Sequence, residues 1–511
     1  AALAVLAGVA LYDVVQRTHA ILRNFPIVGH LRYLLESVGP ELRQYIVAGN
    51  HDERPFNREQ RRWIYASAKS QNNYLGFGSE HDQERSAGYA IVKHAAFPVA
   101  SPLPGDPGYD PTYAIACEKV LGGPAERRKA FRPASVINVS AMSFGALSGA
   151  AVEALNRGAA TAGCLHNTGE GGLSPHHLHG GDLIFQIGTG YFGCRDGDGR
   201  FSLPRLMELV DAHPSIRAIE IKLSQGAKPG AGGILPRAKL TPEIAAIRGV
   251  DPDRDCVSPA RHSAFTDADS LLDVVEAIAA ATGLPVGLKS AVGQLDFWHA
   301  LTRQIETSDR TVDFVTIDGG EGGTGAAPPV FADHVGLPFK IGFSRVQRLF
   351  AERGLHERIV FIGSGKLGFP EAALVGFALG CDLINVAREA LLSIGCIQAL
   401  KCHTNHCPAG ITTQSAWLSR GLDPHLKADR VAHYVMTLRK ELLALAHAAG
   451  VDHPARLDAR AIDLLDDRFG TRTLAEVFGG RGRGLAVDDD PPLFGRPSPP
   501  VSRTPLAFRR S

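Results

Sequence analysis

Three cysteines in the last quarter of the chain have the type and spacing of ligands for an inorganic cluster. Cys396, Cys402 and Cys407 fall within twelve residues, six and five positions apart, and a proline follows the last of them. Soft thiolate ligands closed by a Cys-Pro pair are typical of iron–sulfur sites. A zinc site, with His403 or His406 as the fourth ligand, is the alternative. The trailing Cys-Pro favours the iron–sulfur interpretation.

Two glycine-rich segments could bind a phosphate. Asp318–Ala326 follows the strand-like run FVTI, and Gly363–Lys366 lies between a second such run and a helical pattern. Glycines let backbone N–H groups converge on an anion, and a helix N-terminus favours negative charge. Two successive loops of this kind late in a barrel are the usual phosphate site for a flavin or a sugar phosphate. A pair of tight turns is the alternative.

A third glycine motif is misleading. Gly188–Gly193 satisfies the spacing G-x-G-x-x-G and follows an apolar run. A dinucleotide-binding fingerprint must also open a helix. Here the motif continues into Cys194–Gly199, which has the composition of a turn. We therefore interpret it as a barrel loop.

The elements that must position these residues form a repeated strand–helix pattern between about residues 90 and 420. Eight such units fit a (β/α)₈ TIM barrel better than a doubly wound sheet, and a barrel keeps its active site in the loops after its strands. The expected strands are Ser135–Ser143, Leu165–Thr168, Leu183–Ile187, Ala218–Leu223, Pro285–Ser290, Phe314–Asp318, Ile359–Gly363 and Leu383–Val386. The helices expected between them include Ser148–Gly163, Asp267–Ala281, Phe343–Gly354 and Pro370–Gly380.

Composition agrees with a globular α/β enzyme. The 511 residues include 54 Lys and Arg against 53 Asp and Glu, a formal net charge of +1, and 44% are hydrophobic. No basic excess exists to neutralise phosphates, which removes the electrostatic argument for a nucleic-acid partner. The apolar content is too high for a disordered chain. The other five of the eight cysteines are scattered, which favours a reducing compartment over a disulfide scaffold.

The start of the chain is apolar up to Asp13. Twelve helical residues span roughly 18 Å, short of the roughly 30 Å hydrocarbon core of a bilayer. A membrane-anchor remnant over residues 1–15, a signal remnant and a buried helix are the three interpretations, and the absence of a cleavage-site pattern weakens the second. Arg23–Glu36 follows as an amphipathic helix that either rests on a surface or packs on the body.

Several motifs, taken in order, make the chain resemble the FMN-binding domain of glutamate synthase. The resemblance runs from about Ser140 to Gln414. Its motifs are SAMSFGALS, HNTGEGG, QIGTGYFG, KLSQGAKPGAGG, the segment Ser258–His262, VGLKSAVG, IDGGEGGTGAAP and CIQALKCHTNHCPAGITTQ. The resemblance implies a (β/α)₈ barrel that holds FMN beside a [3Fe–4S] cluster, and a stand-alone member of the family.

The implied domain plan has four parts. Residues 1–90 form an N-terminal helical extension and residues 91–424 the FMN-binding barrel with its iron–sulfur loop. Residues 425–478 form C-terminal helices, and residues 479–511, rich in Gly, Pro and Arg, a flexible tail.

The resemblance also implies a reaction and its residues. Ammonia and 2-oxoglutarate form an imine, which takes a hydride from reduced FMN to give glutamate. Lys228 and Arg248 are the expected clamps for the substrate carboxylates, and Glu170 handles a proton near the reacting carbon. The residues expected to contact FMN are Ser140, Ala141, Met142, Ser143, Gln186, Lys289, Gly322, Gly323, Gly363, Gly365, Ala387 and Arg388, and the cluster ligands are Cys396, Cys402 and Cys407.

Three departures from the family pattern leave alternatives open. The chain has no cysteine before Cys117 to serve as a glutaminase nucleophile, so ammonia is expected free or from a separate subunit. No nicotinamide-binding domain is evident, so a ferredoxin-like or membrane donor is expected to supply electrons. Ile234 stands where the family usually has a glutamine that contacts the substrate, and a lost contact to a charged group is worth roughly 1.5–3 kcal/mol.

The alternatives to a glutamate synthase are therefore two. One is a flavin oxidoreductase acting on another 2-oxo or 2-amino acid or an amine, and the other is an electron-relay subunit of a membrane complex. The expected location is the cytoplasm, with attachment to the cytoplasmic face of the membrane if the anchor interpretation holds.

Overall fold

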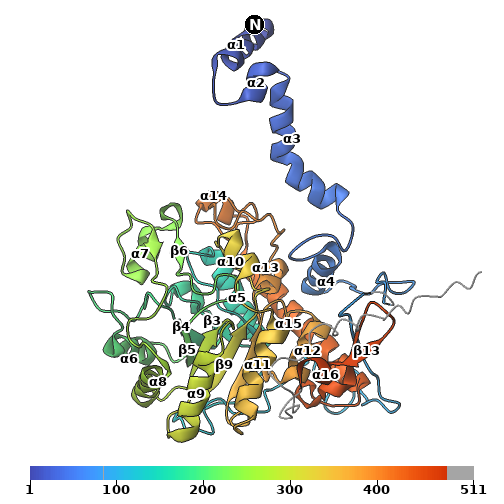
Figure 1. Ribbon diagram of the computed structural model, residues 1–511, viewed down its shortest axis with the longest axis vertical. Coiled ribbons are helices and arrows are strands. Elements are labelled where there is room, and N and C mark those ends of the chain that lie inside the picture. Colours follow the sequence, from blue (N-terminus) through green and yellow to red (C-terminus); the bar gives the residue numbers. More distant parts are fainter. Residues whose placement is uncertain (84–85, 480–511) are drawn as a thin grey trace, which may run out of the picture.

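Eight parallel strands close into a barrel in the computed structural model, which describes residues 1–83 and 86–479 (Figure 1). The strands follow one another around the barrel in chain order, and β11 closes it by pairing with β2. They are β2 (Ile137–Val139), β3 (His166–Asn167), β4 (Leu183–Ile187), β5 (Ile216–Lys222), β8 (Val286–Ser290), β9 (Phe314–Asp318), β10 (Val360–Ser364) and β11 (Leu383–Val386). Each overlaps one expected strand, so the predicted TIM barrel is confirmed.

Helices follow the strands and cover the outside of the barrel. The four expected helices are all present, and the first shows why: Ser148 accepts a hydrogen bond from the Ala151 N–H at its start, and left-handed Gly163 ends it. The helices of the barrel are α5 (Gly149–Ala162), α6 (Leu203–Ala212), α7 (Pro242–Arg248), α8 (Ala268–Thr282), α9 (Asp296–Thr307), α10 (Pro329–His334), α11 (Phe339–Ala351), α12 (Pro370–Leu379) and α13 (Arg388–Ser393).

An insertion between β5 and β8 builds one wall of the active-site face. It contains the two-stranded antiparallel pair β6 (Ile234–Leu235) and β7 (Cys256–Val257), with α7 between them. The segment Gly188–Gly193 leads instead into turns, and α6 begins only at Leu203, so this motif is the barrel loop that the sequence predicted.

The C-terminal region packs across the barrel. Helix α15 (Pro424–Ala448) lies against α5 and α12, and it is followed by α16 (Leu474–Phe478). The strands β12 (Ile462–Leu465) and β13 (Thr471–Thr473) pair with β1 (Ala90–Val92) in a small antiparallel sheet. The sequence predicted only helices here, because strands of three or four residues carry too few positions to show an alternating pattern. Residues 480–511 of the predicted tail lie outside the described residues.

The N-terminal residues form an extension that stands clear of the barrel (Figure 1). Its helices are α1 (Ala2–Val15), α2 (Ala20–Asn24) and α3 (Gly29–Leu42), and a π-helical turn continues to Val47. Helix α4 (Arg58–Ala68) packs on the body against α15 and α13, and α14 (Ala416–Ser419) lies beyond the cysteine segment. None of the helices within the described ranges is long and apolar enough to cross a membrane.

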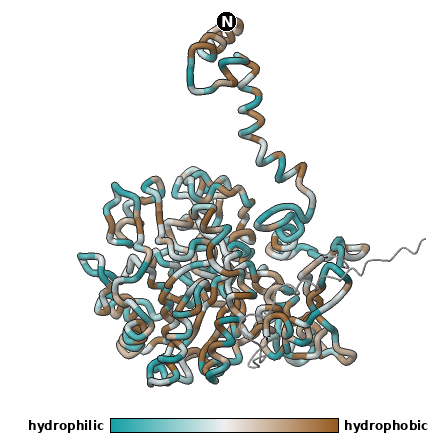
Figure 2. Tube along the Cα trace, in the orientation of Figure 1, coloured by the Kyte–Doolittle hydropathy of each residue, from teal (hydrophilic) through white to brown (hydrophobic). Residues whose placement is uncertain are grey.

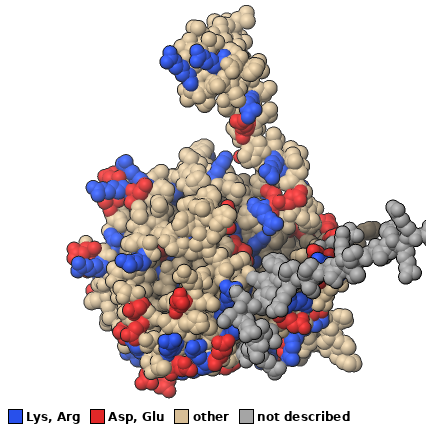
Figure 3. Space-filling model, viewed as in Figure 1, with Lys and Arg blue, Asp and Glu red and all other residues tan. Residues whose placement is uncertain are grey.

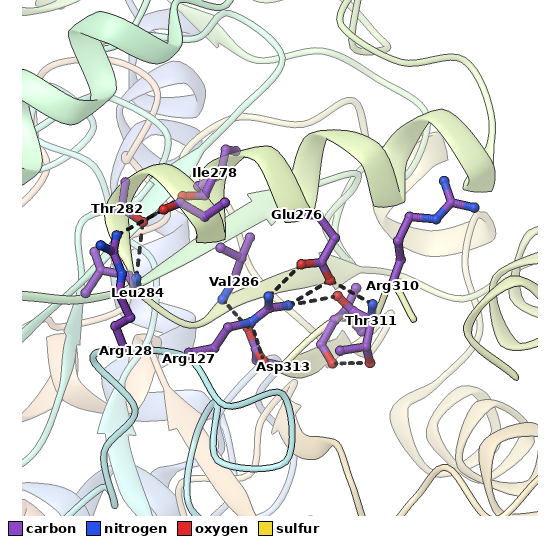
Figure 4. Close-up of polar contacts among 12 residues, drawn as sticks. Arg127, Arg128, Glu276, Ile278, Thr282, Leu284, Val286, Arg310, Thr311 and Asp313 are labelled. Atoms are coloured by element: carbon purple, nitrogen blue, oxygen red, sulfur yellow. Dashed lines mark hydrogen bonds and ion pairs between the residues drawn. The ribbon is translucent and has the colours of Figure 1, made fainter. Parts of the chain in front are cut away.

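A buried ion network at the amino ends of the strands fixes β8 and β9 to α8 (Figure 4). Arg127 donates from Nε to Asp313 at 3.0 Å and from Nη1 to Glu276 at 2.6 Å. Asp313 also accepts from the Val286 N–H at 2.7 Å. Burial raises the pKa of Asp313 to about 6, although Arg127 opposes the rise.

Replacing Arg127 with methionine is expected to destabilise the fold by about 3–5 kcal/mol near neutral pH, because two carboxylates then lack their cation. The loss, followed by the thermal midpoint, should shrink as pH falls to about 5, since Asp313 with its raised pKa takes up a proton there. Arg128→Met is the matched control, because Arg128 is exposed and donates to the Ala280 carbonyl oxygen. Equal losses in the two variants would contradict this role of the network.

Candidate active site

A cavity of about 260 Å³ opens at the carboxyl ends of the barrel strands. Loops that follow separate strands meet here because parallel strands end at one face of a barrel. The cavity brings together residues that lie up to 357 positions apart. The expected residues that line it are Ser140, Ala141, Met142, Ser143, Glu170, Gln186, Lys228, Arg248, Lys289, Gly322, Gly323, Gly365, Ala387, Arg388, Cys396, Cys402 and Cys407.

Gly363 is the expected site residue that lies elsewhere. It belongs to β10, and a Cβ built on it would lie 2.8 Å from the Cys381 Sγ and 3.0 Å from the Phe339 ring. Alternation along the strand turns this position toward the surrounding helices, away from the cavity. Its neighbours Ser364, Gly365 and Lys366 line the cavity instead.

The floor of the cavity carries a surplus of positive charge around one carboxylate. Glu170 Oε1 lies 2.8 Å from the Lys222 Nζ. Burial raises the pKa of Glu170, but the charges of Lys222, Lys228 and Arg248 outweigh it and hold this pKa below its usual value. Glu170 is therefore ionised at neutral pH, and three cations surround it.

Lys228 and Arg248 are buried cations without a carboxylate partner. Their exposed fractions are 7% and 5%, and neither forms an ion pair in the part of the chain that the structure describes. Arg248 donates from Nη2 to the Phe144 carbonyl oxygen at 3.0 Å, and its guanidinium lies over the Phe192 ring. Its Nε is buried and has no hydrogen-bond partner. Buried cations of this kind are costly unless an anion joins them.

A buried carboxylate inside the barrel fixes the orientation of Gln186. Glu220 is fully buried and accepts from the side-chain amide of Gln186 at 2.6 Å and of Asn167 at 2.8 Å. The Thr316 hydroxyl donates to its other oxygen at 2.7 Å. Because one N–H of the Gln186 amide donates to Glu220, the amide oxygen and the second N–H remain available to a ligand.

The opposite end of the cavity is suited to a phosphate. Gly322 and Gly323 follow β9, and Gly365 and Lys366 follow β10. A Cβ on Gly323 would lie 2.4 Å from the Arg388 Cδ, so any other residue there would require the Arg388 side chain to move. Lys366 and Arg388 supply two positive charges beside these glycines.

Lys289 lines the same cavity and contacts the end of the neighbouring strand. It is 5% exposed at the end of β8, and its Nζ lies 3.6 Å from the Asp318 carboxylate at the end of β9. Asp318 also accepts from the Gly226 N–H at 3.0 Å. The pair holds a lysine at the position where the sequence analysis expects contact with the flavin ring.

The three cysteines border the same cavity. Their thiols influence one another's charge, and burial raises the pKa of Cys396 to about 11. At least one pair of the three sulfur atoms lies more than 4.8 Å apart. Within the described residues, none of these cysteines belongs to a set of three His, Cys, Asp or Glu ligand atoms that all lie within 4.8 Å of one another. Ligand atoms of a single tetrahedral zinc lie about 3.8 Å apart when they are sulfurs.

Sequence reasoning missed four residues that the tertiary structure brings to the site: Lys222, Glu220, Lys239 and Asp318. Lys239 is 2% exposed and donates to the Ala146 and Cys402 carbonyl oxygens, at 2.7 and 3.2 Å. A signal for two of them was present in the sequence. Glu220 and Lys222 are two positions apart in β5 and therefore lie on the same face of the strand, so charged residues on that face indicate a polar site.

Ile234 reaches the rim of the cavity from β6 and is 56% exposed. Gly233 beside it approaches Glu170, since a Cβ there would lie 3.2 Å from the Glu170 Oε1. An apolar, partly exposed side chain therefore lies beside the residue that approaches Glu170.

Comparison with known proteins identifies the family of the chain. The family model described as the conserved region in glutamate synthase matches residues 116–452. The glutamate synthase large subunit-like protein YerD of Bacillus subtilis is 38% identical over 477 residues, which covers 88% of this chain and 90% of that protein. The archaeal glutamate synthase [NADPH] of Methanocaldococcus jannaschii is 36% identical over 320 residues, 62% of this chain and 59% of that one. A solved flavocytochrome b2 structure is 13% identical, with a TM-score of 0.41 and coverage of 95% and 94%.

Proposed function

The chain belongs to the glutamate synthase family, and from this membership we propose that it reductively aminates 2-oxoglutarate with ammonia, using FMN and an iron–sulfur cluster. The matched region spans 90% of YerD but only 59% of the archaeal relative. The glutamate synthase activity named for the archaeal relative is therefore a proposal for this chain.

The observation that carries the proposal is the charge of the cavity floor. Lys222, Lys228 and Arg248 surround the single carboxylate Glu170, which leaves two positive charges in excess. A 2-oxo dicarboxylate brings two negative charges and would supply the partners that Lys228 and Arg248 lack. A monocarboxylate or a neutral amine would leave one buried cation unpaired.

The residues present fit FMN. The glycines after β9 and β10, with Lys366 and Arg388, form a cradle that any Cβ on Gly323 would fill, and they would hold the phosphate. Gln186 and Lys289 would contact the ring. When bound, FMN supplies the hydride. Lys289, a fixed cation at the end of β8, would stabilise negative charge on the reduced ring.

The three cysteines fit a polynuclear cluster better than a single zinc ion. Each iron of such a cluster takes one thiolate, so the ligands stand farther apart than around one metal ion. The separation of the Cys396, Cys402 and Cys407 thiols agrees with that requirement. The proposal therefore assigns these three residues to a [3Fe–4S] cluster beside the flavin.

Within the reaction, the chain's own side chains would bind and orient the substrate, and one of them would move a proton. Lys228 and Arg248 would hold the two substrate carboxylates and so fix the keto carbon above the floor. Glu170, ionised and held by Lys222, would accept a proton from the cationic nitrogen formed when ammonia adds to the keto carbon, and would return it to the hydroxyl that leaves as water. Electrons would come from a ferredoxin-like or membrane donor, and ammonia free or from a separate subunit.

The test is anaerobic. The purified protein is reduced, 2-oxoglutarate and ammonium are added, and the return of oxidised-flavin absorbance is followed. Rapid reoxidation that needs both compounds would support reductive amination. Bound flavin that stays reduced with both compounds present would contradict the proposal.

A different 2-oxo acid is the second candidate, and Ile234 is the observation that favours it. Ile234→Gln is expected to lower the KM for 2-oxoglutarate about tenfold or more, because a hydrogen bond to a charged group is worth roughly 1.5–3 kcal/mol. Steady-state kinetics with several oxo acids would measure it. Val257→Gln, a change at an exposed residue of the paired strand β7, is the control. An unchanged preference would mean that position 234 does not contact the substrate.

A further inference from the structure

The N-terminal extension exposes an unusual amount of apolar surface. More than half of the exposed large apolar side chains among the described residues lie between Leu3 and Val47, a small part of the chain. The hydropathy colouring shows apolar residues along the whole projection (Figure 2). A surface of this size on a projecting segment marks an interaction site.

Helix α1 is apolar on every side, which favours lipid over a protein groove as its partner. No charged residue precedes Asp13, and Leu3, Val5, Leu6 and Leu11 are all exposed. A protein groove takes one face of an amphipathic helix, whereas an all-apolar helix is covered on all sides by a core or by lipid. The helix is roughly 21 Å long, enough to enter one leaflet.

The exposed charged side chains of the tip are all basic. Asp13 is the only acidic residue among the first 35 and is fully buried, where it accepts from the Ile27 N–H and lies 2.9 Å from the His30 Nε2. Arg17 and Arg23 are exposed at the base of α1 and in α2. Basic side chains therefore face outward at the tip (Figure 3), at the position where anionic lipid headgroups would meet them.

We propose that the α1–α2 tip docks on an anionic lipid surface, with the apolar side chains of α1 entering the leaflet and Arg17 and Arg23 lying among the headgroups. The base of the extension joins the body beside the cysteine segment. Gln44 donates to the Ile397 carbonyl oxygen at 3.0 Å, and Lys401 lies 3.4 Å from Glu41. Docking therefore turns the cysteine side of the barrel toward the membrane.

Vesicle flotation of the full flavin-loaded chain tests the proposal. The wild type is expected to float with vesicles that contain about one third phosphatidylglycerol, and several-fold less with phosphatidylcholine alone or at high salt. Leu3→Glu with Leu11→Glu should lower binding at least tenfold, since charged residues are costly below the headgroups. Arg17→Gln with Arg23→Gln should lower binding about thirtyfold on anionic vesicles at low salt.

Two matched pairs control for the number and kind of substitutions. Phe97→Glu with Phe469→Glu changes two exposed apolar residues on the body, and Arg254→Gln with Arg460→Gln removes two exposed arginines there. Both pairs should bind as the wild type does, and flavin absorbance reports that every variant is folded.

Two results would overturn the proposal. One is flotation that is the same for the tip variants and the body variants. The other is no flotation of the wild type together with a dimer, measured by light scattering, that Leu3→Glu with Leu11→Glu converts to a monomer. The second result would identify another copy of this chain as the partner.

Discussion

Replacing Arg248 with alanine is expected to lower kcat/KM for the oxo acid about a hundredfold to a thousandfold while FMN remains bound. Arg248 is 5% exposed, lines the cavity and forms no ion pair within the described residues, so the proposed substrate carboxylate would supply the anion that this cation lacks. Truncating one member of a buried charge pair costs about 2–5 kcal/mol. Lys228→Ala is expected to behave in the same way, since this lysine also lacks an ion pair.

Stopped-flow reoxidation of the reduced flavin by the oxo acid and ammonium measures this effect separately from electron delivery. Arg237→Ala is the control, because Arg237 lies in the same insertion but is exposed and pairs with exposed Asp253. Unchanged reoxidation in both Arg248→Ala and Lys228→Ala, or steady electron flow to an acceptor without any oxo acid, would favour the electron-relay alternative.

Replacing Cys396 or Cys402 with serine is expected to remove the iron–sulfur cluster. Each cysteine would supply one thiolate, and a serine hydroxyl is a far weaker ligand for a soft site. Iron and acid-labile sulfide should fall at least tenfold per chain, while the flavin content changes little, because Lys366 and Arg388 at the phosphate end are untouched. Iron analysis and the low-temperature EPR spectrum of the purified protein are the measurements.

Cys117→Ser is the matched control for these variants. Cys117 is buried outside the cavity, where its Sγ lies 3.9 Å from the Asp382 carbonyl oxygen, so the variant makes the same change of thiol to hydroxyl away from the proposed cluster. Zinc in place of iron in the wild type, lost in Cys402→Ser, would replace the cluster interpretation with the zinc alternative. Full iron retention in both ligand variants would contradict the assignment of these cysteines.

The eight strands could be predicted from local pattern because buried parallel strands are short apolar runs followed by polar or glycine-rich loops. Their bounds shifted by a few residues, most at Ser135–Ser143, of which the structure keeps Ile137–Val139 as β2. The small sheet of β1, β12 and β13 was missed, since its strands join segments about 370 positions apart and have no local signature.

The residues of the site could be recognised from sequence motifs, but their ion pairs and burial could not. The motif residues Glu170, Lys228 and Arg248 could be named from the sequence, but the ion pair of Glu170 with Lys222 joins the loop after β3 to the end of β5. Burial decides whether a lysine is a solvated charge or an unpaired cation, and burial depends on the whole fold.

The sequence by itself determined the strand order, the family motifs and the three thiols, because these depend on residue type and spacing along the chain. Only the tertiary structure decided that Gly363 faces the helices while Gly365 faces the cavity, that Glu220 orients Gln186, and that two cations lie buried without carboxylates. Each of these depends on which side chains meet across the barrel, and closure of the barrel, rather than any local pattern, brings them together.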